Sequence, residues 1–262
     1  MEKKILKPSS SYFLSQKYWR LSRNILGKKI WTYLYKLSQK FKFENKLNIL
    51  KNMNLELLLN LNYPSFEGAQ KNNGELKFSY YLKKFNSSKP DGDYRNFLDK
   101  LFSSSKLKIK TILEIGISEG AGIKALKEYF SNSYLWGVDI DPATFIENDK
   151  QIVKCGKVDQ LNLNSLKINA AEFRVKFDLI IDDGWHHPES QLNSLIAYLP
   201  YLNNNGIYII EDIVHKDYFK LFSGVKKILE EKSFNVSYYN FYVPGRAEIS
   251  DELGYMVIKR EK

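Results

Sequence analysis

Two short segments of the sequence place acidic and imidazole side chains directly after runs of apolar residues. The first reads Ile-Ile-Asp-Asp-Gly-Trp-His-His from Ile180 to His187, and the second reads Ile-Ile-Glu-Asp from Ile209 to Asp212. Their four carboxylates would repel one another at one site unless a cation lay among them. Carboxylate oxygens suit Mg²⁺, which takes few protein ligands and keeps water or substrate oxygens. The pattern therefore indicates a divalent-metal site beside imidazoles that can accept a proton.

A glycine-rich segment, Glu114–Gly122, comes earlier in the chain, at the end of an apolar run that reads as a strand. Glycines at such a position let the backbone turn tightly and let a ligand approach it. Acids also follow the next two apolar runs, at Asp139 and at Asp159-Gln160. The carboxyl ends of parallel strands open onto one crevice, where open sheets bind ligands. Asp139 is placed there to accept hydrogen bonds from ribose hydroxyls, and Asp141 is the competing candidate.

The elements that must position these residues alternate from about residue 106, where short apolar strands are separated by helix-length segments. The seven expected strands are KTILEIG, SYLWGVDI, QIVKCGKV, FDLIIDD, GIYIIED, FNVSYYNFYV and GYMVIKR. This alternation predicts a mainly parallel sheet covered on both faces by helices. The last two strands have no helix between them, so one edge strand should run antiparallel. We predict an α/β, Rossmann-like catalytic domain over residues 106–262, preceded by a helical region over residues 1–105.

The first 60 residues carry all of the excess positive charge. They hold 13 Lys and Arg against 3 acids, a net +10, which equals the net charge of the whole chain. Trp19, Trp31 and several tyrosines lie among these cations, and apolar residues recur at helical spacing. Basic helices with aromatic residues can lie on anionic membrane surfaces. A helical cap that packs on the catalytic domain or on a partner subunit is the alternative interpretation.

The composition is that of a globular protein, with 44% apolar and 27% charged residues, which excludes a disordered polymer and a disulfide scaffold. The lone Cys155 allows neither an internal disulfide nor a Cys-rich zinc site, although the histidines leave zinc open. No apolar run is long enough to span a bilayer, and the first residues lack the apolar core of a secretory signal. We expect a cytoplasmic protein, peripheral to the membrane if the basic segment binds lipid.

The segments ILEIGISEGAG, SYLWGVDIDP and VDQ resemble those of class I S-adenosylmethionine-dependent methyltransferases, and the resemblance covers roughly residues 106–262. It implies that the glycine-rich turn lies against the methionine part of the cofactor. It also implies that Asp139 holds the ribose and that Asp159 lies near the adenine. The residues expected to bind S-adenosylmethionine are Glu114, Gly116, Gly120, Asp139, Asp159, Gln160 and Asp182.

The pair of segments DDGWHH and IIED resembles the metal-dependent macrolide-sugar O-methyltransferases and the cephalosporin-hydroxylase-like group. Carried over position by position, the metal ligands would be Asp183, Glu211 and Asp212. The resemblance implies Mg²⁺, with Mn²⁺ as an alternative, and His186 as the general base. His187 adds a second candidate base, and Asp183 takes part in catalysis through the metal. Trp185 stands where the family has a small residue, which implies a differently shaped pocket.

We therefore expect an S-adenosylmethionine- and Mg²⁺-dependent O-methyltransferase that acts on the hydroxyl of a nucleotide sugar, a glycoside or a surface-polysaccharide precursor. A catechol-like acceptor is the nearest alternative, but a histidine after the acids of the fourth strand favours the sugar. The basic, aromatic N-terminus suggests an RNA methyltransferase. The carboxylate cluster would repel phosphates, which disfavours a nucleic-acid partner. An oligomer is compatible with the sequence.

Overall fold

The computed structural model describes residues 28–55, 76–104, 109–142, 152–213, 216–243 and 252–260. The chain divides into two compact units, Met1–Asn45 and Lys46–Lys262. In the first unit, the described residues belong to helix α2, Lys28–Asn52, one of the helices expected from the basic segment. The short helix expected before Pro64 lies outside the described residues. Within the described ranges, no helix has both the length and the apolar character needed to cross a membrane.

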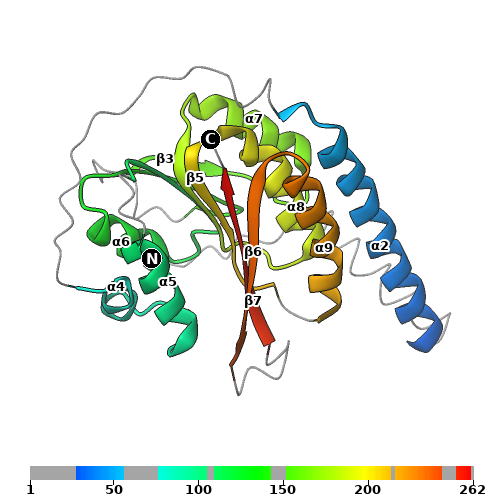
Figure 1. Cartoon of the computed structure of the whole chain (residues 1–262), viewed down its shortest axis with the longest axis horizontal. Helices are drawn as coiled ribbons and strands as arrows, with labels where there is room; N and C mark the ends of the chain where they lie inside the picture. Colours follow the sequence, from blue (N-terminus) through cyan, green and yellow to red (C-terminus); the bar gives the residue numbers. More distant parts are fainter. Residues whose placement is uncertain are drawn as a thin grey trace, which may run out of the picture. The chain divides into compact units, whose positions relative to one another are not determined.

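The second unit is built on one seven-stranded sheet, with the strand order β3-β2-β1-β4-β5-β7-β6 (Figure 1). The strands are β1 Thr111–Ile115, β2 Tyr134–Asp139, β3 Ile152–Lys157, β4 Phe177–Asp182, β5 Leu202–Ile210, β6 Phe234–Tyr242 and β7 Glu252–Arg260. Strands β1 to β5 pair in parallel, and β7 is antiparallel to both of its neighbours. The predicted seven-stranded, mainly parallel sheet is therefore confirmed.

The antiparallel strand β7 lies one place in from the edge, between β5 and β6. Residues Leu253–Ile258 of β7 are all buried, whereas exposed and partly exposed residues are interspersed along β6. A strand that is buried on both faces suits the interior of a sheet, and a strand with one wet face suits its edge. The expected antiparallel strand of the final pair is β7, and β6 forms the edge.

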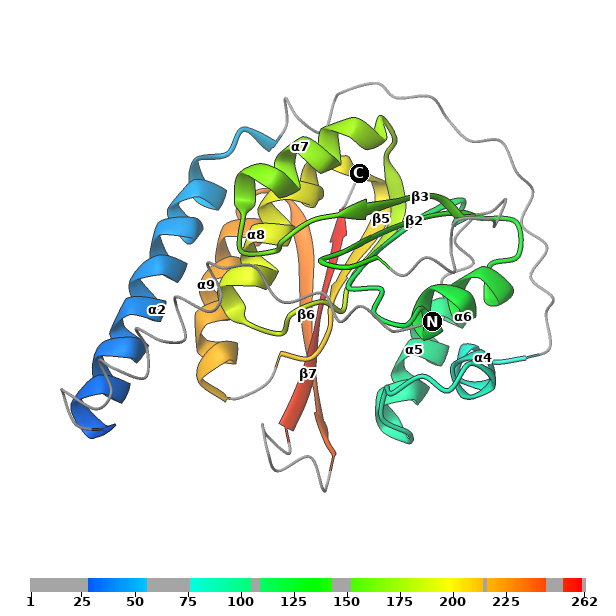
Figure 2. The same ribbon diagram turned by 180° about the vertical axis from the view of Figure 1, so that it is seen from behind.

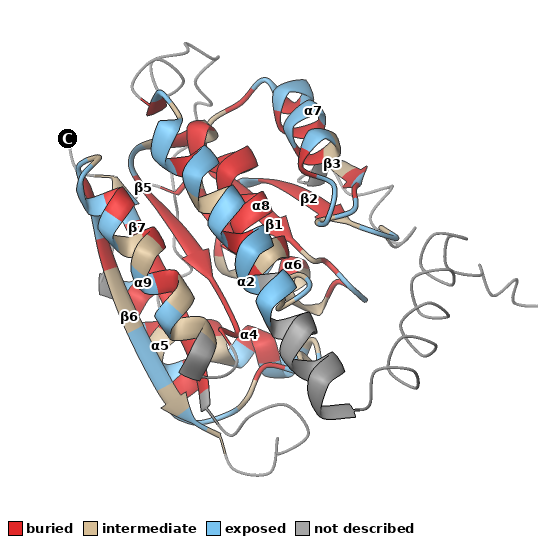
Figure 3. Cartoon of the chain, turned by 90° about the vertical axis from the view of Figure 1, so that its right-hand side faces the viewer, coloured by how far each residue is buried: buried red, intermediate tan, exposed pale blue. Residues whose placement is uncertain are grey.

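Six of the described helices cover the two faces of the sheet in the second unit. Helices α4, α5 and α6 lie on one face, and α7, α8 and α9 lie on the other (Figures 1 and 2). Their bounds are α4 Phe78–Lys84, α5 Asp93–Ser104, α6 Ala121–Tyr129, α7 Leu163–Phe173, α8 Pro188–Tyr198 and α9 Lys216–Glu230, and a 3₁₀ turn, η2 Leu199–Tyr201, follows α8. Figure 3 shows buried residues along the central strands and exposed residues on the outward sides of the helices. This is the arrangement that the alternation of strands and helices predicts.

Helices α4 and α5 belong to the same hydrophobic core as the strands. Phe78, Leu98 and Ile123, from α4, α5 and α6, join one buried cluster with strand residues such as Ile181 and Ile209. Aromatic contacts fix α5 in particular, because the ring of Tyr94 lies 4.5 Å from that of Tyr255, and the ring of Phe97 lies 5.0 Å from it. The start of α5 and the loop before it are thereby held near the polar ends of the strands.

Candidate metal and cofactor site

The carboxyl ends of two neighbouring parallel strands, β4 and β5, carry the acidic residues of the site, and the end of β1 lies beside β4. In the register of the sheet, Ile115 of β1 pairs with Asp182 of β4, and Asp182 pairs with Ile210 of β5. The ladder continues one residue further, because the Asp183 N–H donates to the Ile115 carbonyl at 2.9 Å and the Glu211 N–H donates to the Asp182 carbonyl at 2.9 Å. Asp183 and Glu211 are therefore brought to the same level at adjacent strand ends.

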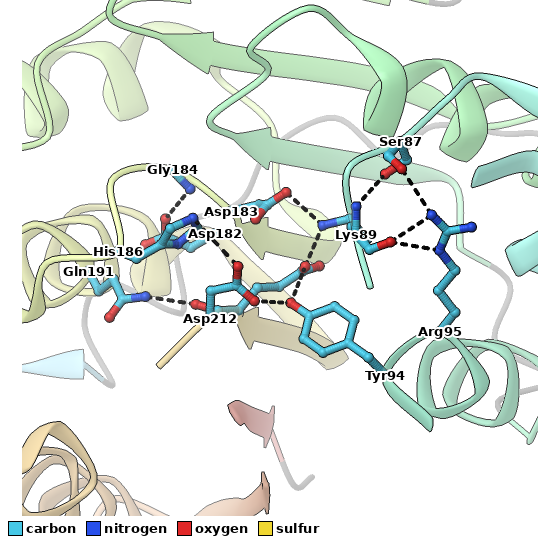
Figure 4. A network of polar contacts seen from close by, with 11 residues as sticks. Ser87, Lys89, Tyr94, Arg95, Asp182, Asp183, Gly184, His186, Gln191 and Asp212 are labelled. Carbon is cyan, nitrogen blue, oxygen red and sulfur yellow. Dashed lines mark hydrogen bonds and ion pairs between the residues drawn. The ribbon is translucent and has the colours of Figure 1, made fainter. Parts of the chain in front are cut away.

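Three of the described side chains form a cluster that could hold a metal ion. Asp183, His186 and Asp212 each offer one ligand atom, and these atoms all lie within 4.8 Å of one another. The Nε2 atom of His186 lies 3.7 Å from Oδ2 of Asp212 (Figure 4). Two carboxylates suit a hard cation such as Mg²⁺ or Mn²⁺, and an imidazole is compatible with Mn²⁺ or with a base beside the ion. The donor set therefore fits the predicted metal.

Glu211 lies next to this cluster and is fully buried. Its Oε2 atom accepts hydrogen bonds from the Lys89 ammonium and, at 3.3 Å, from the Tyr94 hydroxyl. Its Oε1 atom is buried without a hydrogen-bond partner among the described residues. A buried polar atom that lacks a partner is costly, so this oxygen is available as a further ligand for a cation.

Sequence reasoning missed the cation that the structure places among the acids. The Lys89 ammonium bridges the strand ends, donating to Oδ2 of Asp183 at 2.6 Å and to Glu211. The Tyr94 hydroxyl also donates to Asp212, so residues before the predicted catalytic domain complete the site (Figure 4). Repulsion among the acids predicts that some cation lies between them. Nothing in the segment Ser87–Arg95 indicates that its lysine is that cation.

The electrostatics of the site follow from burial and from this lysine. Burial alone lowers the pKa of Lys89, but the charges of Asp183 and Glu211 outweigh it and raise that pKa above its ordinary value. Burial raises the pKa of Glu211, and Lys89 opposes the shift. Burial also raises the pKa of Glu114, and it raises the pKa of Asp182 to about 7. Carboxylates in this environment resist ionisation until more positive charge is supplied.

The glycine-rich turn packs directly against the metal-binding segment. Gly116 has a φ of +87°, and a Cβ atom at this position would lie 2.3 Å from the Cα atom of Gly184 and 2.5 Å from the carbonyl oxygen of Asp183. Gly120, the N-cap residue of α6, also has a positive φ. The predicted cofactor turn and the first acidic segment are thus in backbone contact.

Asp139 is the last residue of β2 and contacts the glycine-rich turn, whereas Asp141 follows the strand. The Asp139 carboxylate accepts from the N–H of Ser118 at 2.9 Å and from the N–H of Asp141 at 2.9 Å. Asp141 itself is exposed and lies 4.0 Å from the Lys157 ammonium. Glu114 is buried beneath the turn, where its Oε1 atom would touch any Cβ placed on Gly122.

Gln160 ties the end of β3 to the end of β4. Its side-chain amide donates to Oδ1 of Asp182 and to the Ser194 hydroxyl, both at 2.9 Å, and its Oε1 atom accepts from the Trp185 N–H at 2.6 Å. Asp159, the preceding residue, is exposed and accepts from the Leu161 N–H. Gln160 therefore sets the conformation of the segment that carries Trp185 and the histidines.

The two histidines of this segment point in different directions. His186 faces Asp212, whereas His187 is the N-cap residue of α8. The ring of His187 lies 5.8 Å from that of Trp185 and 6.5 Å from that of Tyr218. Trp185 is 54% exposed. Pro188 at the first position of α8 fits a helix start and fixes where the segment ends.

Part of the chain is similar in sequence to known O-methyltransferases. No protein-family model matches the sequence. Demethylmacrocin O-methyltransferase from Streptomyces fradiae is 30% identical over 122 residues, which are 44% of this chain and 30% of that protein. L-olivosyl-oleandolide 3-O-methyltransferase from Streptomyces antibioticus is 33% identical over 108 residues, 38% of this chain and 27% of that protein. The chain resembles sugar O-methyltransferases. It spans between 27% and 35% of the length of the curated relatives it matches.

A solved structure of a methyltransferase shares the fold. MycE, a methyltransferase from the mycinamycin biosynthetic pathway solved with Mg, SAH and mycinamycin VI, matches with a TM-score of 0.56 at 19% identity. The match covers 72% of this chain and 56% of that one. This similarity establishes the Rossmann-like methyltransferase fold for the sheet and its helices.

Most of the predicted site residues therefore form two adjoining groups at the carboxyl ends of the parallel strands. One group surrounds the glycine-rich turn and comprises Glu114, Gly116, Gly120, Asp139 and, through Gln160, Asp182. The other comprises Asp183, His186, Glu211 and Asp212. Asp159 accepts from the Leu161 N–H and His187 is the N-cap residue of α8. Lys89, Tyr94 and Arg95 join the site from outside the predicted set.

Proposed function

We propose that this protein is an S-adenosylmethionine- and divalent-metal-dependent O-methyltransferase that acts on a sugar hydroxyl. The proposal rests on one observation: the Gly116 turn is in backbone contact with the segment that carries Asp183 and His186. A methyl donor on the turn would then lie beside a metal and a base. Three of the similar proteins are named as O-methyltransferases of rhamnosyl or olivosyl compounds, which supports a sugar as the acceptor.

The cofactor half of the proposal uses the turn, Asp139 and Gln160. Asp139 already accepts two backbone N–H bonds and presents its charge at the rim of the turn, where ribose hydroxyls would donate to it. The methionine part would lie against the turn at Gly116, where the missing side chain lets the turn meet the backbone of Asp183 and Gly184. Asp159 and Gln160 would lie near the adenine. Glu114 would lie beneath the glycine-rich turn that holds the cofactor.

The metal half uses Asp183, Glu211 and Asp212 as ligands, with Mg²⁺ or Mn²⁺ as the ion. When bound, the ion would lower the pKa of an acceptor hydroxyl and hold it in place. Asp183 and Asp212 are close enough to share one ion. Oε1 of Glu211 is a buried oxygen that a ligand set could use.

His186 is the proposed general base. Its Nε2 atom faces Asp212 at 3.7 Å, on the same side as the other proposed ligands. His186 would take the hydroxyl proton while the hydroxyl oxygen forms a bond to the methyl carbon and the carbon–sulfur bond of the sulfonium breaks. The products are a methyl ether and S-adenosylhomocysteine. A positioned base of this kind contributes about 10²–10⁴-fold to the rate.

A paired substitution tests the assignment. The protein is incubated with S-adenosylmethionine, Mn²⁺ and a panel of nucleotide sugars, glycosides, catechols and RNA, and methylated products are detected by mass. We expect a sugar product, its loss in excess chelator and its loss in His186→Gln. His187→Gln, at the N-cap of α8, is the matched control and should retain most of the rate. Full turnover in chelator would exclude the metal, and a product from catechol or RNA alone would exclude the sugar.

Residues 1–60 would place this enzyme at an anionic surface. In the described part of the segment, Leu37 and Phe41 are exposed one helical turn apart, beside the exposed Lys40. Basic helices with such apolar side chains bind anionic lipid, and each Lys or Arg adds about 1 kcal/mol. We expect co-sedimentation with anionic vesicles, weakened by salt and lost on removal of residues 1–40. No difference between anionic and neutral vesicles would refute this role and leave the segment as a packing or oligomerisation element.

A further inference from the structure

A buried lysine occupies the site although the proposed chemistry does not require one. Lys89 is 8% exposed. Its ammonium donates to Oδ2 of Asp183 at 2.6 Å and to Oε2 of Glu211. Figure 4 shows the nitrogen directed at Asp183. Both acids belong to the predicted ligand set, so an internal cation holds two of the positions that a metal would use.

The loop around Lys89 is fixed by a second buried cation. Arg95, which is 7% exposed, donates to the Lys89 carbonyl through two nitrogens, at 2.9 and 2.6 Å, and to the Ser87 carbonyl at 2.9 Å. Its remaining nitrogen lies 2.8 Å from the Asp91 carboxylate. The guanidinium therefore brackets the loop and sets the point from which Lys89 reaches the acids (Figure 4).

A divalent cation and this ammonium compete for the same oxygens. Mg²⁺ binds carboxylate oxygens at about 2.0–2.1 Å. With the ammonium 2.6 Å from Asp183, a shared oxygen would bring the two cations to within about 5 Å. Solvent screens such a pair weakly in a buried site. Oε1 of Glu211, buried and without a partner among the described residues, adds a ligand atom that the lysine leaves unused.

We propose that Lys89 is the resident counter-ion of this carboxylate cluster, and that a divalent cation binds by displacing its ammonium from Asp183 and Glu211. The proposal rests on the metal site of the proposed function and adds to it an exchange of one cation for another. Without metal, Lys89 holds the acids together. With metal, the ammonium leaves the two carboxylates and becomes accessible to solvent.

Direct metal binding tests the exchange without any assay of turnover. Mn²⁺ is titrated into the full chain by calorimetry, and bound Mn²⁺ is counted by electron paramagnetic resonance. Lys89→Met removes the charge at similar length, and we expect it to bind Mn²⁺ at least tenfold more tightly than the natural protein. Lys89→Arg keeps a competing charge and should remain weak. Lys84→Met is the control, because Lys84 pairs with Glu128 at 3.2 Å on the exposed surface of α4.

A labelling experiment on the natural protein tests the same displacement of Lys89 without a variant. It is needed if Lys89→Met fails to fold. Lysines are acetylated with a succinimidyl ester, with and without saturating Mn²⁺, and each site is followed by mass spectrometry. We expect Lys89 to be protected without metal and to react at least tenfold faster with it, while Lys84 is unchanged. Lys89 that stays protected at saturating Mn²⁺ would overturn the exchange and leave the metal site standing. If none of the proteins bound Mn²⁺, the metal site of the proposed function would itself be refuted.

Discussion

Alanine at Gly116 tests whether the glycine-rich turn and the first acidic segment are built as one unit. The added Cβ would lie 2.3 Å from the Gly184 Cα atom, 2.5 Å from the Asp183 carbonyl oxygen and 2.6 Å from the Gly184 nitrogen. All three atoms belong to the backbone, so no side-chain rotation relieves the overlap. The segment after β4 must move, and Asp183 moves with it.

The expected loss of stability has two parts that a second glycine separates. Gly116 has a φ of +87°, and a residue with a Cβ costs about 1–2 kcal/mol in a left-handed conformation. Overpacking adds about 1–3 kcal/mol. Gly92 has a φ of +78°, and nothing lies within 4 Å of the place that a Cβ atom would take there, so alanine at this position meets the conformational cost alone. We expect losses of about 2–5 kcal/mol for Gly116→Ala and about 1–2 kcal/mol for Gly92→Ala.

Urea unfolding followed by circular dichroism measures both variants against the natural protein, with unchanged slopes required for the comparison. Mn²⁺ titration of folded Gly116→Ala adds a second readout, because displacement of Asp183 should weaken the metal site. Equal losses of stability in the two variants would refute the overlap, since both would then reflect the backbone conformation only.

Three further predictions follow from single residues or segments. Asp139→Ala should weaken S-adenosylmethionine binding about tenfold or more by calorimetry, because hydrogen bonds to a charged acceptor contribute about 1.5–3 kcal/mol, whereas Asp141→Ala should have little effect. Burial and, to a lesser extent, the charge of Glu114 raise the pKa of Cys155 to about 11. Alkylation at pH 8 should therefore be roughly a hundredfold slower than for an ordinary thiol, and its rate should rise as the pH approaches 11. Fast alkylation of the folded protein at pH 8 would contradict the burial of this thiol. A chain that begins at residue 106 should not fold, whereas one that begins at residue 46 should; a sharp thermal transition in the shorter chain would count against the shared core.

The strands and the positions of the strand-end acids could be predicted because each rests on a local pattern. The last parts of β4 and β5, Leu179–Ile181 and Ile207–Ile210, are apolar and lead directly into acids, as expected of parallel strands covered on both faces. Parallel pairing then brings Asp182 and Ile210 to the same level, whatever the details of the loops. The place of β7 was less apparent, although its run from Leu253 to Ile258 is more continuously apolar than β6 and suits the interior position it takes.

The residues that complete the site could not be predicted because their contacts join distant parts of the chain. Lys89 lies 94 residues before Asp183 and 122 before Glu211, and it is one of 40 Lys and Arg residues in the sequence. Its segment, SSKPDGDYR, reads as an ordinary turn of polar residues. Only the packing of α5 through Tyr94 and Phe97 on β7 places that turn over the strand ends.

The segment before residue 106 therefore contributes both to the hydrophobic core and to the polar site at the strand ends. The packing of α5 accounts for both contributions. Tyr94 inserts its ring into the core beside Tyr255, and its hydroxyl emerges at Asp212 and Glu211. The same helix start supplies Arg95, which fixes the loop that delivers Lys89. A buried carboxylate cluster without a cation would be strongly destabilising. Because the apolar face of α5 anchors the polar groups that neutralise these acids, the stability of the metal-free site depends on the same packing that completes the hydrophobic core.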